Sequence, residues 1–415
     1  MTETQAIINA YHQARKENLR AALATVVRVE GSAYRRPSVR MFITENGETT
    51  GVLSGGCLER DVCERAAQVM RTGDAVVVRY DSTSDDDIVW GLGMGCNGVV
   101  EILIEPVNDD GKDDLLRFLA ECSAGQRSGA MATVVLRQGE TEITIGNRAF
   151  LYPSGAKSEP PASAGGSESN STIGGVVISR HIFHDLRAAV QNGHPSIKRY
   201  EVDAGSVEVF IELVEPPVPL VIFGAGDDAL PLVSFARNLG WHTTVVDTRA
   251  RATSIERFAE ADAVLLCRPE AVSDCVPLTE HSAVVLMTHN YLHDLELLKT
   301  LMNRRVRYLG CLGPKRRAER LLLELAGGTA ASAATYLGQF HAPAGLDIGA
   351  ETPVEIALSI VAEIRAVLAG REGGLLRRRN GSIHNKVTEP GIDAAWPVGV
   401  NTPARSSQVV MSQAR

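Results

Sequence analysis

The stretch VIFGAGDDALPLVSFARNLGWHTTVVDTR, residues 221–249, has the layout of a dinucleotide-binding unit. An apolar strand leads into a G-x-G turn at Gly224 and Gly226, a helical segment follows, and the next strand ends in Asp247. In such units the glycines let the backbone approach a pyrophosphate, the helix N-terminus offers unpaired N–H groups, and the acid receives ribose hydroxyls. The order of these features predicts a Rossmann fold, with Gly224, Gly226 and Asp247 as candidate nucleotide-binding residues.

Two acidic residues argue against ordinary dinucleotide binding. Asp227 and Asp228 follow Gly226 directly, where a pyrophosphate would sit, and their carboxylates would repel it. Carboxylates are favoured at a helix N-terminus, so we expect the pair to cap the helix and to occupy the anion site internally. NAD(P) therefore stays an alternative ligand and not the main expectation, because a fold does not fix a function.

A second loop of this half has polar residues at a strand end. THNYLHD, residues 288–294, places His289, His293 and Asp294 beyond an apolar strand, on the edge where ligands of such sheets bind. The alternative is that these residues cap the next helix. The sequence leaves both interpretations open.

The whole chain divides by its patterning. After VEPPVP at 214–219, near-continuous apolar strands alternate with helical runs, which predicts a doubly wound parallel sheet covered on both faces. The N-terminal half mixes helices with strands, including a hairpin turned at Asn46-Gly47, and predicts an α+β fold. We expect an N-terminal domain at 1–107, a middle α+β extension at 108–215 with a flexible loop at 154–171, a Rossmann-like domain at 216–370 and a polar, disordered tail at 371–415.

Composition narrows the class of protein. The 415 residues carry 42 basic and 50 acidic side chains, a formal charge of −8, which argues against nucleic-acid binding. There is no apolar run of about 18 residues and no signal-peptide core, so we expect a cytoplasmic protein without membrane contact. The 7 cysteines include no C-x-x-C pair, which argues against zinc and, in the cytosol, against a disulfide framework.

Two cysteines lie in glycine-rich settings that suit a reactive or ligand-binding thiol. Cys57 follows Gly55 and Gly56 in LSGGCLERDV, residues 53–62, where we expect a helix to begin with Cys57 in its first turn. A helix N-terminus favours thiolate over thiol, which raises nucleophilicity and metal affinity. Cys96 in MGCNG is the second candidate. The ordinary alternative is that the glycines make the turn and the cysteine fills a gap in the core.

The basic segment GSAYRRPSVRM adds a charged element to these thiols. Arg35, Arg36 and Arg40 crowd a short loop and the strand that leaves it, an arrangement that suits a phosphate or another anion. Two thiols and several guanidinium groups in a small pocket fit an anionic cofactor that holds a soft metal or labile sulfur. Spacing alone does not identify the ligand, and arginine-rich loops are often only solvated surface.

The motifs, taken in order, resemble the XdhC/CoxI family. GSAYRRPSVRM, SGGCLE and the GCNG segment are similar to that family's N-terminal α+β domain. FGAGDDALPLV, THNYLHDLELL, YLGCLGPKRR and GLDIGAETPVEIALSIVAEI resemble its C-terminal Rossmann domain, a doubly wound parallel sheet. The similarity covers most of residues 5–370. Ser38 departs from the pattern, because many members have glycine there.

Members of this family are accessory proteins of molybdenum hydroxylases such as xanthine dehydrogenase and aerobic carbon monoxide dehydrogenase. The resemblance implies a homodimeric chaperone that binds molybdenum cofactor (molybdopterin), supports its sulfuration and delivers it to the hydroxylase apoenzyme. A cysteine desulfurase is the second partner that it implies. Such a protein is a maturation factor and not an enzyme that turns over a metabolite.

The resemblance also implies roles for single residues. Cys57 is expected to contact molybdenum or its terminal sulfur, and Cys96 is expected to be a second reactive thiol. The pterin phosphate would be held by Arg35, Arg36 and Arg40, and the pocket would be lined by Gly55, Gly56 and Asn97.

Two alternatives from other classes stay open. The first is an NAD(P)-dependent oxidoreductase that uses Gly224, Gly226 and Asp247. The second is an assembly scaffold whose Rossmann domain docks the molybdoenzyme without any ligand.

Overall fold

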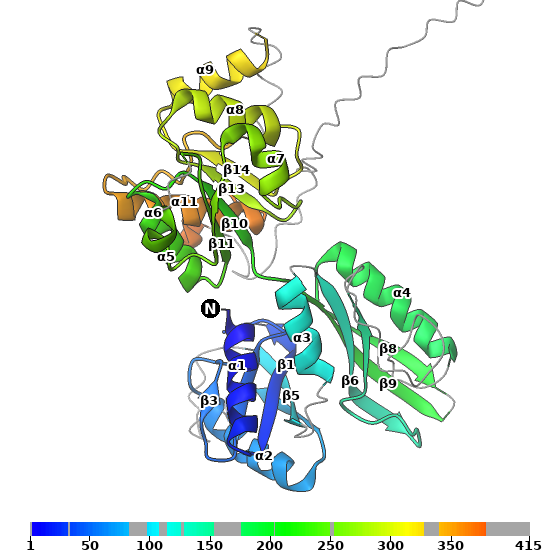
Figure 1. The fold of residues 1–415 in the computed structure, drawn as a ribbon. Helices are drawn as coiled ribbons and strands as arrows, with labels where there is room; N and C mark the ends of the chain where they lie inside the picture. The colour runs from blue at the N-terminus through cyan, green and yellow to red at the C-terminus, as the bar shows by residue number, and fades with distance from the viewer. Residues whose placement is uncertain are drawn as a thin grey trace, which may run out of the picture.

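The described residues of the protein form three β-sheets, each covered by helices (Figure 1). The computed structural model describes residues 2–31, 34–82, 98–107, 114–125, 128–152, 176–202, 204–249, 253–327 and 340–378. Within these ranges, two antiparallel sheets come from the N-terminal half and one parallel sheet from the C-terminal half. The predicted fold class, an α+β region followed by a Rossmann-like sheet, is confirmed.

The first sheet has the strand order β3-β2-β1-β5-β4. Its β2–β3 hairpin turns at Asn46-Gly47 as predicted, and Gly47 takes a φ of +88°. Helix α1 begins after Thr2, whose hydroxyl accepts a hydrogen bond from the Gln5 N–H, and α2 is followed by Gly73 in the left-handed region. The elements are α1 Glu3–Lys16, β1 Ala21–Gly31, β2 Arg40–Thr44, β3 Thr49–Thr50, α2 Glu59–Thr72, β4 Val76–Asp81 and β5 Gly98–Val107.

The two faces of this sheet have separate cores, because successive strand residues point to opposite sides. Met41 and Ile43 of β2 pack with Val62 of α2 on the outer face. Phe42, between them, packs with Ile7 of α1 and Phe150 of the second sheet on the inner face. A residue's position in a strand therefore decides whether it lies on the α2 side or between the two sheets.

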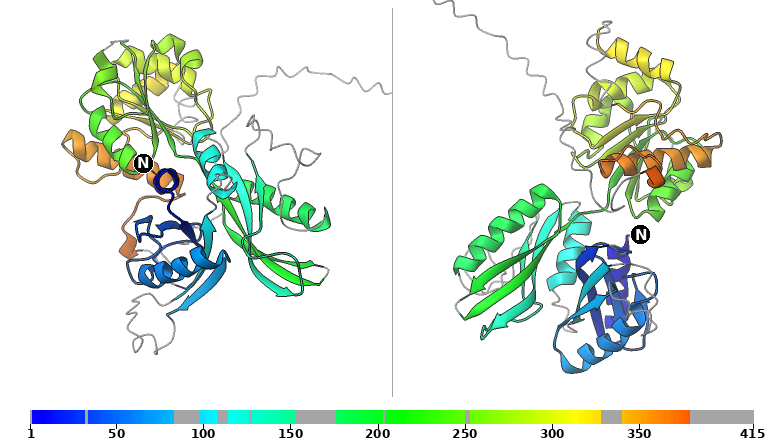
Figure 2. Two further views of the ribbon diagram at one scale, coloured as in Figure 1. Left: turned by 60° about the horizontal axis from the view of Figure 1, so that its bottom comes forward. Right: turned by 180° about the vertical axis from the view of Figure 1, so that it is seen from behind.

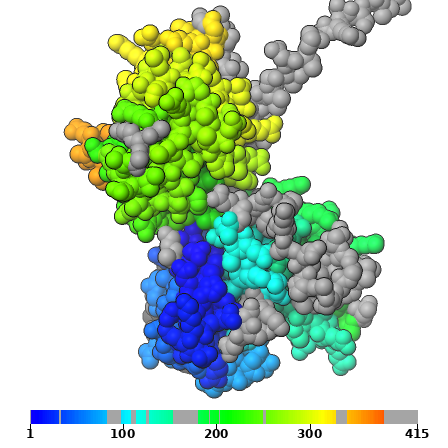
Figure 3. Space-filling view, in the orientation of Figure 1, coloured from blue at the N-terminus to red at the C-terminus, as the bar shows by residue number. Residues whose placement is uncertain are grey.

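The second sheet has the order β7-β6-β9-β8, with α4 on its outer face (Figures 1 and 2). It repeats the plan of the first: an 11-residue strand, β1 or β6, pairs antiparallel with a 10-residue strand, β5 or β9, and each pairing has one register shift. Helices α1 and α3 lie side by side on one surface of the molecule (Figure 3). The elements are α3 Asp114–Gly125, β6 Gly129–Gly139, β7 Arg148–Leu151, α4 Val176–Asn192, β8 Ser196–Val202 and β9 Gly205–Val214.

The third sheet is parallel and has the order β12-β11-β10-β13-β14. Leu220 and Ile222 of β10 pack against α5 and α11, whereas Val221 and Phe223 pack against α8 and α9 on the opposite face. The elements are β10 Pro219–Phe223, α5 Ala229–Asn238, β11 His242–Asp247, α6 Thr253–Arg257, β12 Ala263–Leu266, η2 Pro269–Ala271, α7 Val272–Cys275, β13 Ala283–Leu286, α8 Tyr291–Leu301, β14 Tyr308–Cys311, α9 Lys315–Leu325, α11 Pro353–Leu368 and η3 Leu376–Arg378.

The strand order changes direction beside β10, because β11 and β12 lie on one side of it and β13 and β14 on the other. Ligands of doubly wound sheets bind at the carboxyl edge next to such a switch point. The loops that leave β10 and β13 touch there. An added Cβ at Gly224, whose φ is +126°, would lie 2.2 Å from the Met287 carbonyl oxygen, so only glycine fits this position.

The expected division of the chain can be followed along these elements. β9 ends at Val214 and β10 begins at Pro219, on either side of the proposed boundary between residues 215 and 216. The expected flexible loop at 154–171 lies outside the described residues. Of the tail expected at 371–415, residues 371–378 are described and contain η3, and the rest lies outside the described residues. Among the helices that the structure describes, none is both long and apolar enough to span a membrane.

Candidate functional site

The turn before α2 is organised by the buried side chain of Ser54. Its hydroxyl oxygen accepts hydrogen bonds from the Gly56 and Leu58 N–H groups, both at 3.2 Å. The Cys57 Sγ lies 3.5 Å from the same oxygen. Leu58 is buried in the outer core of the first sheet, and Cys57 packs against that core while remaining partly exposed. The turn therefore holds Cys57, which is partly exposed, in a defined conformation.

Glu59 closes the turn from the helix side. Its carboxylate accepts a 2.7 Å hydrogen bond from the Ser54 N–H and a 2.5 Å bond from the Ser54 hydroxyl. Partial burial works to raise the pKa of Glu59, but the hydrogen bonds from Ser54 and from the Glu59 and Leu58 N–H groups outweigh it and hold the pKa below its ordinary value. This carboxylate takes the position that the helix dipole favours for a negative charge.

The expectation that Cys57 lies in the first helical turn is wrong. Helix α2 begins at Glu59 with Leu58 as its N-cap, so the thiol lies before the helix. The Glu59 side chain folds back to Ser54, whose hydroxyl oxygen accepts from the Gly56 and Leu58 N–H groups at the helix entry. Cys57 is thus a partly exposed residue on an ordered turn that precedes the helix.

The surface next to this thiol is open backbone. Gly55 and Gly56 are exposed, and an added Cβ at either glycine would meet no atom within 4 Å. Gly56 has a φ of +108°, a conformation that disfavours other residues. A flat ligand can therefore lie against the peptide groups beside Cys57 without a side chain between them.

Two other cysteines of the N-terminal half provide a comparison. Burial and then the Glu59 charge raise the pKa of Cys63, which is partly exposed on α2. Cys122 of α3 is fully buried, and burial is the main cause that raises its pKa to about 12. A thiol with a raised pKa is a poor nucleophile and a poor metal ligand at neutral pH. Of these three cysteines, Cys122 is enclosed and Cys63 lies on the helix, whereas Cys57 lies on the turn directly after two exposed glycines.

The basic loop carries exposed groups on the segment between β1 and β2. Tyr34 is 60% exposed and Arg36 is exposed. Arg35 donates to both carboxylate oxygens of Glu3, at 2.6 and 2.5 Å, in the first turn of α1. An exposed pair of this kind exchanges readily with other anions, because water screens it and its net stabilisation is small.

This loop and the Cys57 turn lie at the same end of the first sheet. An added Cβ at Gly51 would lie 2.3 Å from the Arg40 carbonyl oxygen, so the chain passes the start of β2 on its way to the turn. Val39, at the end of the basic loop, and Cys57 also pack against the same outer core. Both segments thus adjoin the start of β2, and Arg35 reaches from the loop to Glu3 of α1, the helix that packs on the inner face.

Arg40 lies on the other side of the sheet. It is buried between the two N-terminal sheets, where it forms an ion pair with Glu212 and donates a 3.0 Å bond to the Ser38 carbonyl oxygen. The expectation that Arg40 grips a phosphate beside Cys57 is therefore corrected, since the residue shares the inner face with Phe42. Cys96 and Asn97, the remaining N-terminal candidates, lie outside the described residues.

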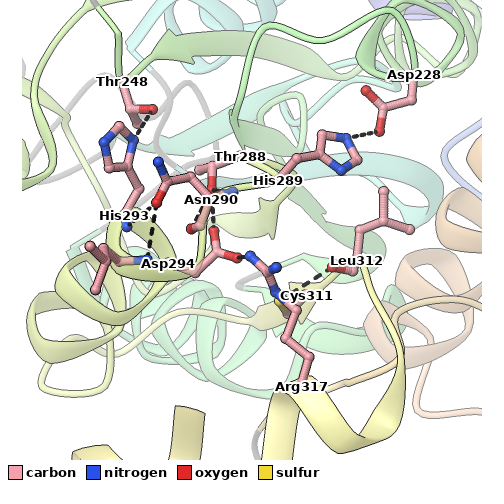
Figure 4. Close-up of polar contacts among 11 residues, drawn as sticks. Asp228, Thr248, Thr288, His289, Asn290, His293, Asp294, Cys311, Leu312 and Arg317 are labelled. Carbon is pink, nitrogen blue, oxygen red and sulfur yellow. Dashed lines mark hydrogen bonds and ion pairs between the residues drawn. The ribbon is translucent and has the colours of Figure 1, made fainter. Parts of the chain in front are cut away.

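The crevice of the Rossmann sheet contains a carboxylate where a pyrophosphate would lie. Asp228 makes no capping bond to α5, contrary to expectation. Its Oδ1 would lie 2.4 Å from a Cβ added at Gly226, and its Oδ2 lies 2.7 Å from His289 Nε2 (Figure 4). Asp227, with a side chain 93% exposed, is paired with Arg257 and does not cap the helix either. The position over Gly226 is nevertheless occupied by a side chain of the protein itself.

Asp247 is unavailable to a ribose as the chain is folded. It is 1% exposed and accepts hydrogen bonds from the Ser254 hydroxyl at 2.6 Å and the Arg249 N–H at 2.9 Å. The Ser254 bond ties the end of β11 to α6, and the Arg249 bond fixes the turn that directly follows the strand. With Asp228 over the glycine turn and Asp247 enclosed, the residues present do not fit an adenine dinucleotide in the usual pose.

The THNYLHD segment is mainly structural. Asn290 caps α8 by accepting bonds from the Leu292 and His293 N–H groups, and His293 Nδ1 lies 3.1 Å from the Thr248 hydroxyl (Figure 4). Buried Asp294 accepts from the Thr288 hydroxyl at 2.5 Å and from Arg317 at 2.6 Å, which fastens this loop to α9.

His289 is the exception in this segment. It is a non-glycine residue with a φ of +54°, and its side chain is 58% exposed. The sequence places it beyond a strand end, but nothing in the residue types of this segment signals a positive φ. Strained backbone of this kind clusters at ligand sites.

Comparisons with known proteins match both halves of the chain. Residues 14–81 match the XdhC and CoxI family, and residues 220–364 match the XdhC Rossmann domain. A Bacillus subtilis protein described as a probable xanthine dehydrogenase subunit is 31% identical over 83% of this chain and 92% of its own length. The molybdenum cofactor insertion chaperone PaoD of Escherichia coli is 22% identical over 85% of each chain.

A solved structure extends the likeness to three dimensions. The crystal structure of a protein described as a xanthine dehydrogenase from Bacillus halodurans has a TM-score of 0.67 and 29% identity, and covers 90% of this chain and 97% of its own. Fold and motifs together define a protein with an N-terminal α+β region, which carries the thiol turn, and a C-terminal Rossmann unit. The chain belongs to the XdhC/CoxI family.

Proposed function

We propose that this protein is a maturation factor that binds molybdenum cofactor and delivers it to the apoenzyme of a molybdenum hydroxylase. The E. coli relative is named as a molybdenum cofactor insertion chaperone, and the B. subtilis relative as a probable xanthine dehydrogenase subunit. The observation that carries the proposal is the Cys57 turn, where a partly exposed cysteine follows two exposed glycines and packs on the same core as Val39 of the basic loop. Molybdenum cofactor is the cargo in this account and not a resident group.

The residues of the turn have separable tasks. Cys57 offers a soft sulfur ligand for molybdenum or a contact to its terminal sulfur. Gly55 and Gly56 leave room for the flat pterin against the backbone. Arg35 and Arg36 supply the positive charge for the pterin phosphate, with Arg35 leaving Glu3 when the phosphate arrives.

Exchangeable contacts suit a carrier that must also release its cargo. The ion pair of Arg35 with Glu3 is an internal substitute for the phosphate, so the loop remains ordered when the cofactor leaves. We further propose that the protein is a cytoplasmic homodimer that supports sulfuration of the bound cofactor and meets a cysteine desulfurase for this purpose. The role of Cys96 and Asn97 in the pocket is part of the same proposal.

The test is the molybdenum and pterin content of the full chain after coexpression with the cofactor biosynthesis proteins. Cys57→Ala is compared with Cys63→Ala, a matched cysteine on the adjoining helix. The proposal predicts that wild type and Cys63→Ala carry equal cofactor and that Cys57→Ala carries at least tenfold less. Equal content in all three proteins would contradict the assigned site.

A further inference from the structure

The two N-terminal sheets correspond residue by residue. Thr25 of β1 pairs with Arg40 of β2, and Thr133 of β6 pairs with Arg148 of β7. The register shift follows Val26 in one sheet and Val134 in the other. The strands AALATVVRVEG at 21–31 and GAMATVVLRQG at 129–139 are similar in sequence. Strands β1 and β6 thus have the same length, the same pairing register and a register shift at the same position.

The loops that follow these strands also have the same shape. Ser38 and Gly146 hold equivalent places, with φ of +77° and +88°. The Ser38 N–H donates to the Val26 carbonyl oxygen at 2.8 Å, and the Gly146 N–H donates to that of Val134 at 2.9 Å. Arg40 and Arg148 then donate to the carbonyl oxygens of Ser38 and Gly146, at 3.0 and 3.2 Å.

The contact between the sheets is symmetric as well. Arg40 of the first sheet pairs with Glu212 of the second, and Arg148 of the second pairs with Glu105 of the first. These glutamates are themselves equivalent positions of β9 and β5. The interface core has the same symmetry, because Val27 and Leu103 of the first sheet meet their counterparts Val135 and Phe210. Each sheet thus uses equivalent residues to contact the other sheet, as the two subunits of a twofold dimer do.

We propose that residues 114–214 are a second copy of the unit formed by residues 3–107, and that the second copy is the built-in partner of the first. Differences between the copies then separate ligand-binding residues from scaffold. Tyr34, Arg35 and Arg36 of the first copy correspond to Glu142, Ile143 and Thr144 of the second, and residues 123–266 contain no cysteine.

The comparison assigns one cofactor site to each chain and adds Tyr34 to it. An exposed aromatic ring beside two arginines suits stacking on a pterin. Arg40 has a counterpart, Arg148, with equivalent contacts in the second copy. The one cysteine of that copy, Cys122, is buried, so the second copy has no exposed thiol beside which Arg148 could bind a cofactor. The role that the two arginines share is therefore to join the copies. The assignment of Tyr34 rests on the proposed function, whereas the assignment of Arg40 and Arg148 as joining residues does not.

The experiment uses full-length variants and two readouts. Arg40→Met and Arg148→Met test the joining residues, and the combined variant Tyr34→Glu, Arg35→Ile, Arg36→Thr gives the first copy the loop sequence of the second. Amide hydrogen exchange of β5 and β9 peptides in a urea series reports the stability of the paired copies. Molybdenum and pterin content after coexpression reports the site.

We expect Arg40→Met and Arg148→Met to lower the urea midpoint of both peptides to a similar degree while retaining cofactor content per folded chain. The loop variant should keep the wild-type midpoint and lose cofactor at least tenfold. If the loop variant fails to fold, Arg36→Thr at an exposed position replaces it, with the same expectation in direction.

Two outcomes overturn different parts of the proposal. An unchanged midpoint in Arg148→Met, with Arg40→Met losing cofactor at an unchanged midpoint, would refute the joining role of the two arginines and with it the second copy as built-in partner. Absence of cofactor from wild type, with both arginine variants equally destabilised, would remove the proposed function and the Tyr34 assignment but leave the built-in partner intact.

Discussion

Ser54 and Glu59 hold each other through two hydrogen bonds, at 2.7 Å from the Ser54 N–H and 2.5 Å from its hydroxyl. The same hydroxyl oxygen lies 3.5 Å from the Cys57 Sγ. The pair therefore stabilises the turn that contains Cys57, and the stability of this turn depends on the charge of the Glu59 carboxylate.

Glu59→Gln should lower the free energy of unfolding of the first sheet by about 1 kcal/mol at pH 7, because it removes a charged acceptor at a helix start. Folding lowers the pKa of Glu59, so its contribution is present above the unfolded pKa and is lost as the pH falls through the folded value. The difference from wild type in urea unfolding should shrink toward acid. A difference that is constant with pH, or equal to that of exposed Glu64→Gln, would contradict this explanation.

Ser38→Gly should stabilise the protein by about 1 kcal/mol, since serine adopts a left-handed backbone there that glycine adopts without strain. The reverse change at the equivalent place, Gly146→Ser, should destabilise by a similar amount. Thermal unfolding of both variants checks the prediction. Destabilisation by Ser38→Gly would show that the hydroxyl has a role that outweighs the strain.

Arg28→Leu should cost about 1 kcal/mol of stability at neutral pH. Arg28 lies 3.2 Å from Glu101 and is also paired with Glu208, so its removal leaves two carboxylates near each other. Leucine stands at the equivalent position, Leu136, so the change should be tolerated sterically. Adding Glu208→Gln to Arg28→Leu should recover part of the loss in urea unfolding, and no recovery would contradict the charge explanation.

Calorimetric titration with NAD(H) and NADP(H) should give no binding heat with the wild-type protein. Asp228→Ala removes the carboxylate over Gly226, but it should not create strong binding because Asp247 remains enclosed by Ser254 and Arg249. Micromolar affinity in wild type would restore the oxidoreductase alternative. Affinity only in Asp228→Ala would show that Asp228 alone closes the crevice.

Much of the fold could be predicted from local patterns. The Rossmann unit follows from one strand–glycine–helix–strand stretch, and the turn at Asn46-Gly47 from a dipeptide with strong turn preference. The repeat is harder to predict, because its signal is confined to two similar strands 108 residues apart, which begin at Ala21 and Gly129. The helices and loops around these strands have diverged too far to reinforce the match.

The site could be predicted only in part, because burial and long-range pairing are not local properties. The sequence places Arg40 three residues beyond Pro37, yet the pleat turns it to the inner face, where its partner is 172 residues away. Likewise Glu59 lies two residues after Cys57, but its return to Ser54 depends on the φ of +108° at Gly56. Residue types indicate that the segment can bind an anionic, metal-containing ligand. Tertiary packing determines which of these side chains are accessible to such a ligand.

The central claim, that cofactor binds at Cys57, is tested most directly by thiol labelling. Iodoacetamide modification of each cysteine is followed by mass spectrometry in cofactor-loaded and cofactor-free full-length protein, with exposed Cys275 of α7 as the internal reference. The account predicts that cofactor slows labelling of Cys57 at least tenfold and leaves Cys275 unchanged. Equal labelling of Cys57 in loaded and free protein would contradict it.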